Sequence, residues 1–135
     1  MNRFEVQSIE LAVPLEKAMK LIAEPTQLPR WASAFASVTP GRAVLRTPAG
    51  EVAIELKVSS CPGEGTIDWR MAFQDGSVAT AFSRLVAIDR DHCVYCFVLT
   101  PPPVPLERLE GALDAQARTL AGELRTLKAI LEARG

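Results

Sequence analysis

The sequence predicts an α+β fold in which an antiparallel sheet packs against one long C-terminal helix. A row of leucines at helical spacing fills the last third of the chain, and alternating apolar and polar residues separated by turn signals fill the middle. One strand and one or two short helices precede them. A chain of 135 residues has the length of one domain, so we expect residues 1–135 to form a single unit.

The composition excludes several classes of protein. Hydrophobic residues make up 48% of the chain and charged residues 23%, which is typical of a soluble globular protein. The net charge of −1 gives no basic surface for a nucleic-acid partner, and no apolar run approaches the roughly 20 residues of a membrane span. The first ten residues lack the apolar core of a secretion signal, and the three cysteines do not suggest a disulfide framework. We therefore expect a cytoplasmic protein without membrane insertion.

The C-terminal segment from Pro105 to Leu131 is expected to be helical. Proline suits the first turn, where its missing N–H would have no partner. Ala117 fills the one missing position of a stripe formed by Leu106, Leu109, Leu113, Leu120, Leu124, Leu127 and Leu131. Small residues such as Gly111 and Gly122 also lie along this helix. They allow either close packing on the sheet or space for a ligand between the helix and the sheet.

The N-terminal segment is expected to form a strand over Phe4–Leu11. Pro14 then opens a helix, whose apolar face consists of Leu15, Ala18, Met19 and Ile22. Pro25 and Pro29 end this helix and leave room for a short second helical turn.

The first part of the sheet has a register that charge pairing supports. Pro40-Gly41 and Pro48-Ala49-Gly50 are turn signals. A two-residue turn at Pro48-Ala49 places Arg46 opposite Glu51 and Arg42 opposite Glu55, so that two opposite-charge pairs share one face.

The second part of the sheet is expected to contain two more hairpins. Asp75-Gly76 is a strong signal for a two-residue turn, which pairs Phe73 with Val78, Met71 with Thr80, Trp69 with Phe82 and Ile67 with Arg84. A turn at Arg90-Asp91 then pairs Val86 with Tyr95, Arg84 with Phe97 and Phe82 with Leu99. This register places large aromatic side chains from three successive strands on one face.

The opening of the chain resembles that of the START-like superfamily, also called SRPBCC, which includes polyketide cyclase/dehydrase-like proteins and relatives of the birch-pollen allergen Bet v 1. The resemblance lies in Ala12–Met19, Leu21–Pro25 and Leu28–Trp31, and the element order agrees along the whole chain. It implies a helix-grip fold, in which a curved antiparallel sheet of about six to seven strands grips the C-terminal helix around a deep cavity. Members bind lipids, polyketides, sterols or plant hormones. They share no fixed catalytic motif, so the resemblance supplies no catalytic residue.

An aromatic cavity with a few polar groups is the usual form of a small-molecule site. From the strand registers and the helical segments we predict these ligand-binding residues: Trp31, Phe35, Trp69, Met71, Phe73, Thr80, Phe82, Arg84, Tyr95, Phe97, Leu113 and Ala117. For each aromatic residue taken alone, packing in the hydrophobic core is an equally good explanation.

Arg84 is the most specific of these candidates, because the expected register puts its guanidinium on the apolar face. A buried unpaired charge is costly, so Arg84 either reaches the rim, pairs with a protein acid, or binds an acidic group of the ligand. Tyr95 and Thr80 have hydroxyls that either bind a ligand or satisfy the backbone.

The sequence indicates no metal site and no cofactor. His92, the only histidine, falls in a polar turn. Cys93 and Cys96 are three residues apart on a strand and would face opposite ways.

Three functions remain open at this stage. The first is a carrier or sensor of a small hydrophobic ligand, lipid- or polyketide-like, held between sheet and helix. The second is a polyketide cyclase or dehydratase that uses the same cavity, with Arg84 and Tyr95 or Thr80 as its polar groups. The third is a protein-interaction domain or homodimer without a ligand.

Overall fold

The computed structural model describes residues 4–47, 50–100 and 106–133. For Thr47 and residues 106–116 it describes the backbone and not the side chains. The elements in chain order are β1 (Glu5–Leu11), α1 (Leu15–Ile22), a 3-10 turn (Pro25–Gln27), α2 (Leu28–Trp31), β2 (Phe35–Thr39), β3 (Arg42–Thr47), β4 (Gly50–Cys61), β5 (Thr66–Ala72), β6 (Val78–Asp89), β7 (His92–Leu99) and α3 (Leu106–Glu132). The predicted order of elements is confirmed.

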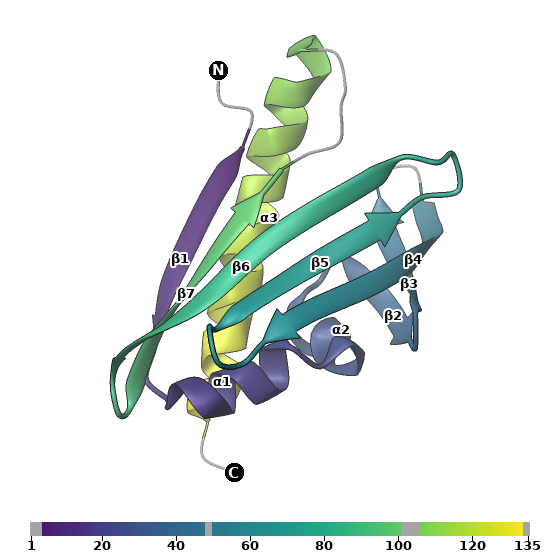
Figure 1. The fold of residues 1–135 in the computed structure, drawn as a ribbon. Coiled ribbons are helices and arrows are strands. Elements are labelled where there is room, and N and C mark those ends of the chain that lie inside the picture. Colours follow the sequence, from purple (N-terminus) through teal and green to yellow (C-terminus); the bar gives the residue numbers. More distant parts are fainter. Residues whose placement is uncertain (1–3, 48–49, 101–105, 134–135) are drawn as a thin grey trace.

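The seven strands form one antiparallel sheet in the order β1-β7-β6-β5-β4-β3-β2. Figure 1 shows the sheet curving in front of α3, with α1 and α2 at the end of the sheet where α3 finishes. We call the face toward α3 the inner face and the opposite one the outer face.

The C-terminal half of α3 packs on the inner face through the predicted leucine stripe. Leu120, Leu124, Leu127 and Leu131 are buried, while the side chains of Leu106, Leu109 and Leu113 lie outside the described residues. The Glu132 carboxylate accepts a hydrogen bond from the backbone N–H of Ala12 at 2.8 Å, and Lys128 Nζ donates to the Glu10 carbonyl at 3.0 Å. None of the helices in the described part of the chain has the length and hydropathy of a membrane span.

The register of β3 and β4 is confirmed. Arg46 lies opposite Glu51 and Arg42 opposite Glu55, as the charge pairing indicated. Their side chains lie on the outer face, because Ala43 and Ile54, which alternate with them, are buried in the core.

The predicted register of β5 and β6 is wrong by one residue. The loop contains three residues, 74–76, because the Phe73 N–H donates to the Ser77 carbonyl at 2.9 Å. The Asp75 carboxylate accepts from the Ser77 N–H and hydroxyl at 2.9 and 2.6 Å, and Gly76 takes a φ of +89°. This is the pattern of a three-residue hairpin loop with glycine in the left-handed region.

The β6–β7 hairpin has the predicted turn and a bulge that the sequence did not reveal. Asp89 pairs with His92, as expected for a turn at Arg90-Asp91, but Ala87 already pairs with Cys93. The irregularity between Ala87 and Asp89 shifts the remaining pairs by one residue. The two errors cancel for β7, so that Tyr95 and Phe97 share the inner face with Trp69 and Met71.

A close backbone contact fixes β6 beside the start of β5. The Leu85 N–H donates to the Gly65 carbonyl at 2.8 Å. Gly65 has a φ of +76°, and a Cβ at this position would lie 2.2 Å from the Leu85 carbonyl oxygen. Only glycine fits there, and the contact sets the pairing of Thr66 with Arg84 that follows.

As a result, alternate residues of β6 occupy faces opposite to those predicted. A one-residue shift turns every side chain of a strand to the other face. The buried residues are Ala79, Ala81, Ser83 and Leu85. The outer face carries Thr80, Phe82, Arg84, Val86 and Ile88.

We expect Gly65→Ala to lower the free energy of unfolding by about 2 kcal/mol or more, because it combines a strained φ with a steric clash. The matched control is Gly63→Ala, since a Cβ at Gly63 meets no atom within 4 Å. Urea unfolding of both variants measures the difference. Equal, small losses would show that the Gly65–Leu85 contact does not constrain the sheet.

Candidate functional site

The inner face contains three large aromatic residues that carry polar atoms. Trp31 comes from α2, Trp69 from β5 and Tyr95 from β7, and all three are buried. The ring of Tyr95 makes edge-to-face contacts with Trp31, at a centroid distance of 6.4 Å, and with Phe97, at 6.2 Å. Edge-to-face packing of this kind stabilises aromatic clusters.

The polar atoms of these three residues find no hydrogen-bond partner among the described residues. They are Nε1 of Trp31, Nε1 of Trp69 and the hydroxyl of Tyr95. Each is shielded from solvent, and a buried polar group without a partner costs about 1–3 kcal/mol. Most buried indole and phenol groups are paired, so three unpaired ones around a single ring require an explanation.

The Tyr95 hydroxyl is protonated at all ordinary pH values. Burial raises its pKa well above the usual range, and the nearby Ser83 and Trp69 oppose this rise only in part. Neither neighbour completes a hydrogen bond of good geometry with Tyr95. The Ser83 hydroxyl instead donates to the Ile67 carbonyl at 2.6 Å. Tyr95 is therefore suited to donating a hydrogen bond, not to acting as a base.

Partly buried apolar side chains pack against the hydrophobic core that contains this aromatic cluster. Phe35, Met71, Phe73 and Phe97 pack against the core without being fully covered, and Ala117 of α3 is also partly buried. The inner residues of β6 between β5 and β7 are small, namely Ala79, Ala81 and Ser83. On the inner face, small side chains of β6 therefore lie between the larger aromatic side chains of β5 and β7.

Three predicted site residues lie on the outer face, so the orientation predicted for them is wrong. Phe82 is 46% exposed and Arg84 is exposed, with its Nε donating to the Glu64 carbonyl at 3.3 Å. The carbonyl of Thr80 accepts from the Thr100 hydroxyl at 2.7 Å. The physical reason is the register of β6 described above. Arg84 therefore does not place its guanidinium on the inner face, where it would meet an acidic ligand. The side chain of Leu113, another predicted site residue, lies outside the described residues.

Two buried polar residues were missed by sequence reasoning. Ser83 was missed because the register turned it outward. Glu123 is only 9% exposed, and its carboxylate accepts from the Ala34 N–H at 2.9 Å and from the Ser33 hydroxyl at 3.3 Å. Burial raises the pKa of Glu123, and these two hydrogen bonds oppose that rise. Its position next to Leu124 on the leucine stripe was the available signal.

The remaining candidates do not form a metal or redox site. No group of three or more His, Cys, Asp or Glu that could hold a metal ion occurs within residues 4–47, 50–100 and 106–133 as described. Cys93 is buried, whereas Cys96 is partly exposed on the opposite face, as the spacing predicted. His92 lies in the polar turn, where Asp89, 2.8 Å from its Nδ1, raises the pKa of the imidazole.

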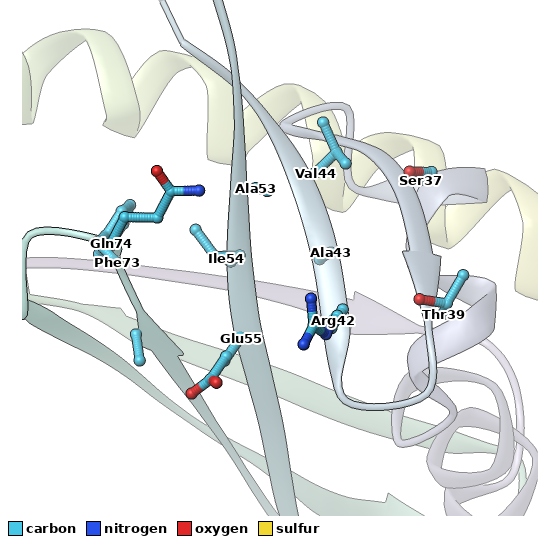
Figure 2. Close-up of a pocket in the computed structure, with 11 residues that line it drawn as sticks. Ser37, Thr39, Arg42, Ala43, Val44, Ala53, Ile54, Glu55, Phe73 and Gln74 are labelled. Atoms are coloured by element: carbon cyan, nitrogen blue, oxygen red, sulfur yellow. The ribbon is translucent and has the colours of Figure 1, made fainter.

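Two surface grooves lie away from the aromatic cluster. A groove of about 500 Å³ follows the outer face of β2, β3 and β4, where Figure 2 shows Ser37 and Thr39 on one side and Phe73 and Gln74 on the other. Its charged residues, Arg42 and Glu55, are exposed. A second groove, of about 680 Å³, runs between α1, α2 and the end of α3 and is lined in part by Lys17, Lys20 and Arg30.

Comparison with known proteins identifies the fold. No family model matches the sequence, and no curated protein matches it. The Zhui aromatase/cyclase from a Streptomyces species aligns over 96% of this chain and 93% of its own, with a TM-score of 0.73 and 11% identity. A START superfamily protein from Mycobacterium smegmatis aligns over 97% and 98%, with a TM-score of 0.69 and 13% identity.

A third solved structure is the di-domain ARO/CYC BexL, of which this chain covers 45%. It aligns over 94% of this chain with a TM-score of 0.70 and 16% identity. The chain has the helix-grip fold. The helix-grip fold that the resemblance of Ala12–Trp31 implied is thus confirmed, including the two short helices after β1 and the long α3. TM-scores of 0.69–0.73 establish the architecture, and identities of 11–16% leave the ligand open.

We expect Tyr95→Phe to raise the free energy of unfolding of the ligand-free protein by about 1 kcal/mol, because it removes a buried hydroxyl that has no partner. Ser83→Ala is the matched control. It also deletes one buried hydroxyl, but this hydroxyl is bonded to Ile67, so stability should fall by about 1 kcal/mol. Urea unfolding reports both values. A loss of stability in Tyr95→Phe similar to that in Ser83→Ala would mean that the Tyr95 hydroxyl is already satisfied.

Proposed function

We propose that this protein binds a small hydrophobic ligand between the inner face of its sheet and α3, as a carrier or sensor. The observation that supports this proposal is the set of three unpaired polar atoms on Trp31, Trp69 and Tyr95 inside an apolar interior. A ligand that meets them would offset a cost that the protein otherwise bears alone.

The surrounding surface suits such a ligand. The partly covered ring of Phe97 and the side chain of Met71 provide apolar contact, and methionine adapts its shape to different ligands. Ala79 and Ala81 add small, buried apolar side chains between these residues. Sites for small molecules combine mostly apolar walls with a few directed polar groups. Lipid-like and polyketide-like molecules fit this description.

A cyclase or dehydratase function is the alternative use of the same site. Fewer residues support this function than the sequence predicted. Arg84 and Thr80 lie on the outer face, so only Tyr95 of the predicted polar residues remains on the inner face. The raised pKa of Tyr95 makes its hydroxyl a donor that polarises a carbonyl, a role compatible with catalysis as well as with binding. Abstraction of a proton would require a different group.

We expect Ala81→Leu to weaken binding of the fluorescent apolar probe N-phenyl-1-naphthylamine by about tenfold, equivalent to about 1.4 kcal/mol. The added carbons occupy the centre of the inner face, where Ala81 is buried between β5 and β7. Ala53→Leu is the control, since it makes the same change on the exposed outer face of β4. Fluorescence titration measures both affinities.

The opposite ranking would place the probe in the outer groove that Ala53 lines and would contradict the proposal. Native mass spectrometry of the protein isolated from the organism that makes it provides the second test. Copurification of a bound small molecule is the expected result, and a chain without any bound molecule that also fails to bind the probe would overturn the proposed function.

A second candidate function is self-association, and the outer face favours it. Five apolar side chains of β6 and the start of the chain are 46–54% exposed there: Phe4, Val6, Phe82, Val86 and Ile88. On β7, Val98 lies between Val6 and Phe82 in the same row. The row of Ser8, Cys96 and Arg84 separates Val86 from these three residues. Exposed apolar side chains of this kind are typical of an interaction surface, and a second copy of the chain offers the same side chains in return.

We expect sedimentation analysis to detect a dimer whose dissociation constant rises at least about tenfold in Phe82→Ser, because the variant removes an aromatic ring from these apolar side chains. Thr80→Ser, on the same strand and face, is the control. A chain that is monomeric at high concentration would contradict self-association and leave the proposal of ligand binding untouched.

A further inference from the structure

We infer that the ligand presents a neutral oxygen acceptor, such as the carbonyl of a ketone, ester or amide, to the polar atoms of Trp31, Trp69 and Tyr95. This inference rests on the proposed function and adds the chemistry of the ligand's polar group.

The three unpaired groups are donors. An indole N–H donates and has no accepting lone pair, so Trp31 Nε1 and Trp69 Nε1 each require an acceptor. The Tyr95 hydroxyl, which burial keeps protonated, has its proton available for the same purpose. Three donors from α2, β5 and β7 around a single ring are complementary to an oxygen with lone pairs and not to another donor.

Two of these donors lie close together, and the third belongs to a ring that packs on Tyr95. Trp69 lies near enough to the Tyr95 hydroxyl to affect its pKa, and the Trp31 ring meets the Tyr95 ring edge to face at 6.4 Å. A carbonyl oxygen has two lone pairs and accepts from two or more such donors. The cluster therefore offers donors, and no acceptor, to the polar group of a ligand.

The charges of the described residues favour a neutral acceptor over an ionised one. Every Lys, Arg and His among the described residues is at least partly exposed, and none is buried with the aromatic cluster. Glu123 is the one charged residue buried in the described part of the chain, and it is an acid. A carboxylate ligand would lose its hydration without gaining a counter-charge, which is far more costly than burying a neutral carbonyl.

The outward position of Arg84 removes the basis for the acidic ligand that the sequence suggested. Its Nε is committed to the Glu64 carbonyl on the outer face. The body of the ligand lies instead on apolar side chains, since Met71 and Phe97 on the inner face are only partly covered. The ligand class that follows is a neutral, largely apolar molecule with a carbonyl group.

The test uses the fact that Trp31 and Trp69 are the only two tryptophans of the chain. A ¹⁵N-labelled sample gives two indole N–H resonances, one from each unpaired atom. The probes are 1-acetonaphthone, 1-methylnaphthalene and 1-naphthoate at pH 7.5, which share one ring system and differ in the polar group. We expect the ketone to bind about tenfold more tightly than either of the others, since each added hydrogen bond contributes about 0.5–1.5 kcal/mol.

The ketone should also move the indole resonances downfield, and Tyr95→Phe should reduce its advantage over 1-methylnaphthalene. Equal affinity of the ketone and the hydrocarbon, or ketone binding that leaves both indole resonances in place, would overturn the inference while the proposed function stands. Tighter binding of 1-naphthoate would overturn it in favour of an anion.

If none of the three probes binds, the molecule found by native mass spectrometry decides. A neutral carbonyl in that molecule supports the inference, and a copurified molecule without one overturns it. A chain that carries no molecule at all overturns the inference, and the proposed function falls with it if N-phenyl-1-naphthylamine also fails to bind.

Discussion

The carbonyl oxygen of Leu85 lies so close to the α-carbon of Gly65 that no side chain fits between them. This contact, with the hydrogen bond from the Leu85 N–H to the Gly65 carbonyl, holds β6 in one register against β5. Because side chains alternate between the faces of a sheet, the register decides the chemistry of the interior. It puts Ala79, Ala81 and Ser83 inside, and it removes Phe82 and Arg84 from the face that packs on α3.

The interior that results is packed with apolar side chains at one end and contains polar atoms without hydrogen-bond partners near Tyr95. At the C-terminal end of α3, four leucines are buried and the helix is joined to β1 and to the Ala12 N–H. Around Tyr95, large rings enclose polar atoms that the described residues leave without hydrogen bonds. Local cost of this kind is often retained at functional sites, where a bound partner relieves it. In the proposed function, stability and binding are linked through the same three side chains.

Local patterns predicted much of this fold because they are decided by neighbouring residues. The leucine stripe of α3 and the charge pairs of Arg42 and Arg46 each specify one element or one hairpin without reference to the rest. The positions of Trp31, Trp69, Tyr95 and Phe97 on the inner side also followed from the sequence. The last two were placed correctly because an unforeseen three-residue loop and an unforeseen bulge compensate for each other.

The face of β6 could not be predicted, since both of its faces carry apolar residues. Phe82, Val86 and Ile88 form the more hydrophobic set, yet this set lies outside. A signal such as Asp75-Gly76 suits loops of two or three residues equally well, and the choice depends on the Asp75 contact with Ser77. Ser83 and Glu123 depend on tertiary contacts with Ile67 and with Ser33 and Ala34, which no local pattern encodes.

The compensation between the loop at 74–76 and the bulge near Ile88 has an evolutionary consequence. Removing one residue from either hairpin alone would turn β7 over and direct Tyr95 to solvent. Removing one residue from both would restore β7 and exchange only the faces of β6, bringing Phe82 and Arg84 inward. Insertions and deletions at these two positions are therefore coupled, and a paired change would convert an interior of alanines into one with a ring and a cation while the surrounding architecture stays the same.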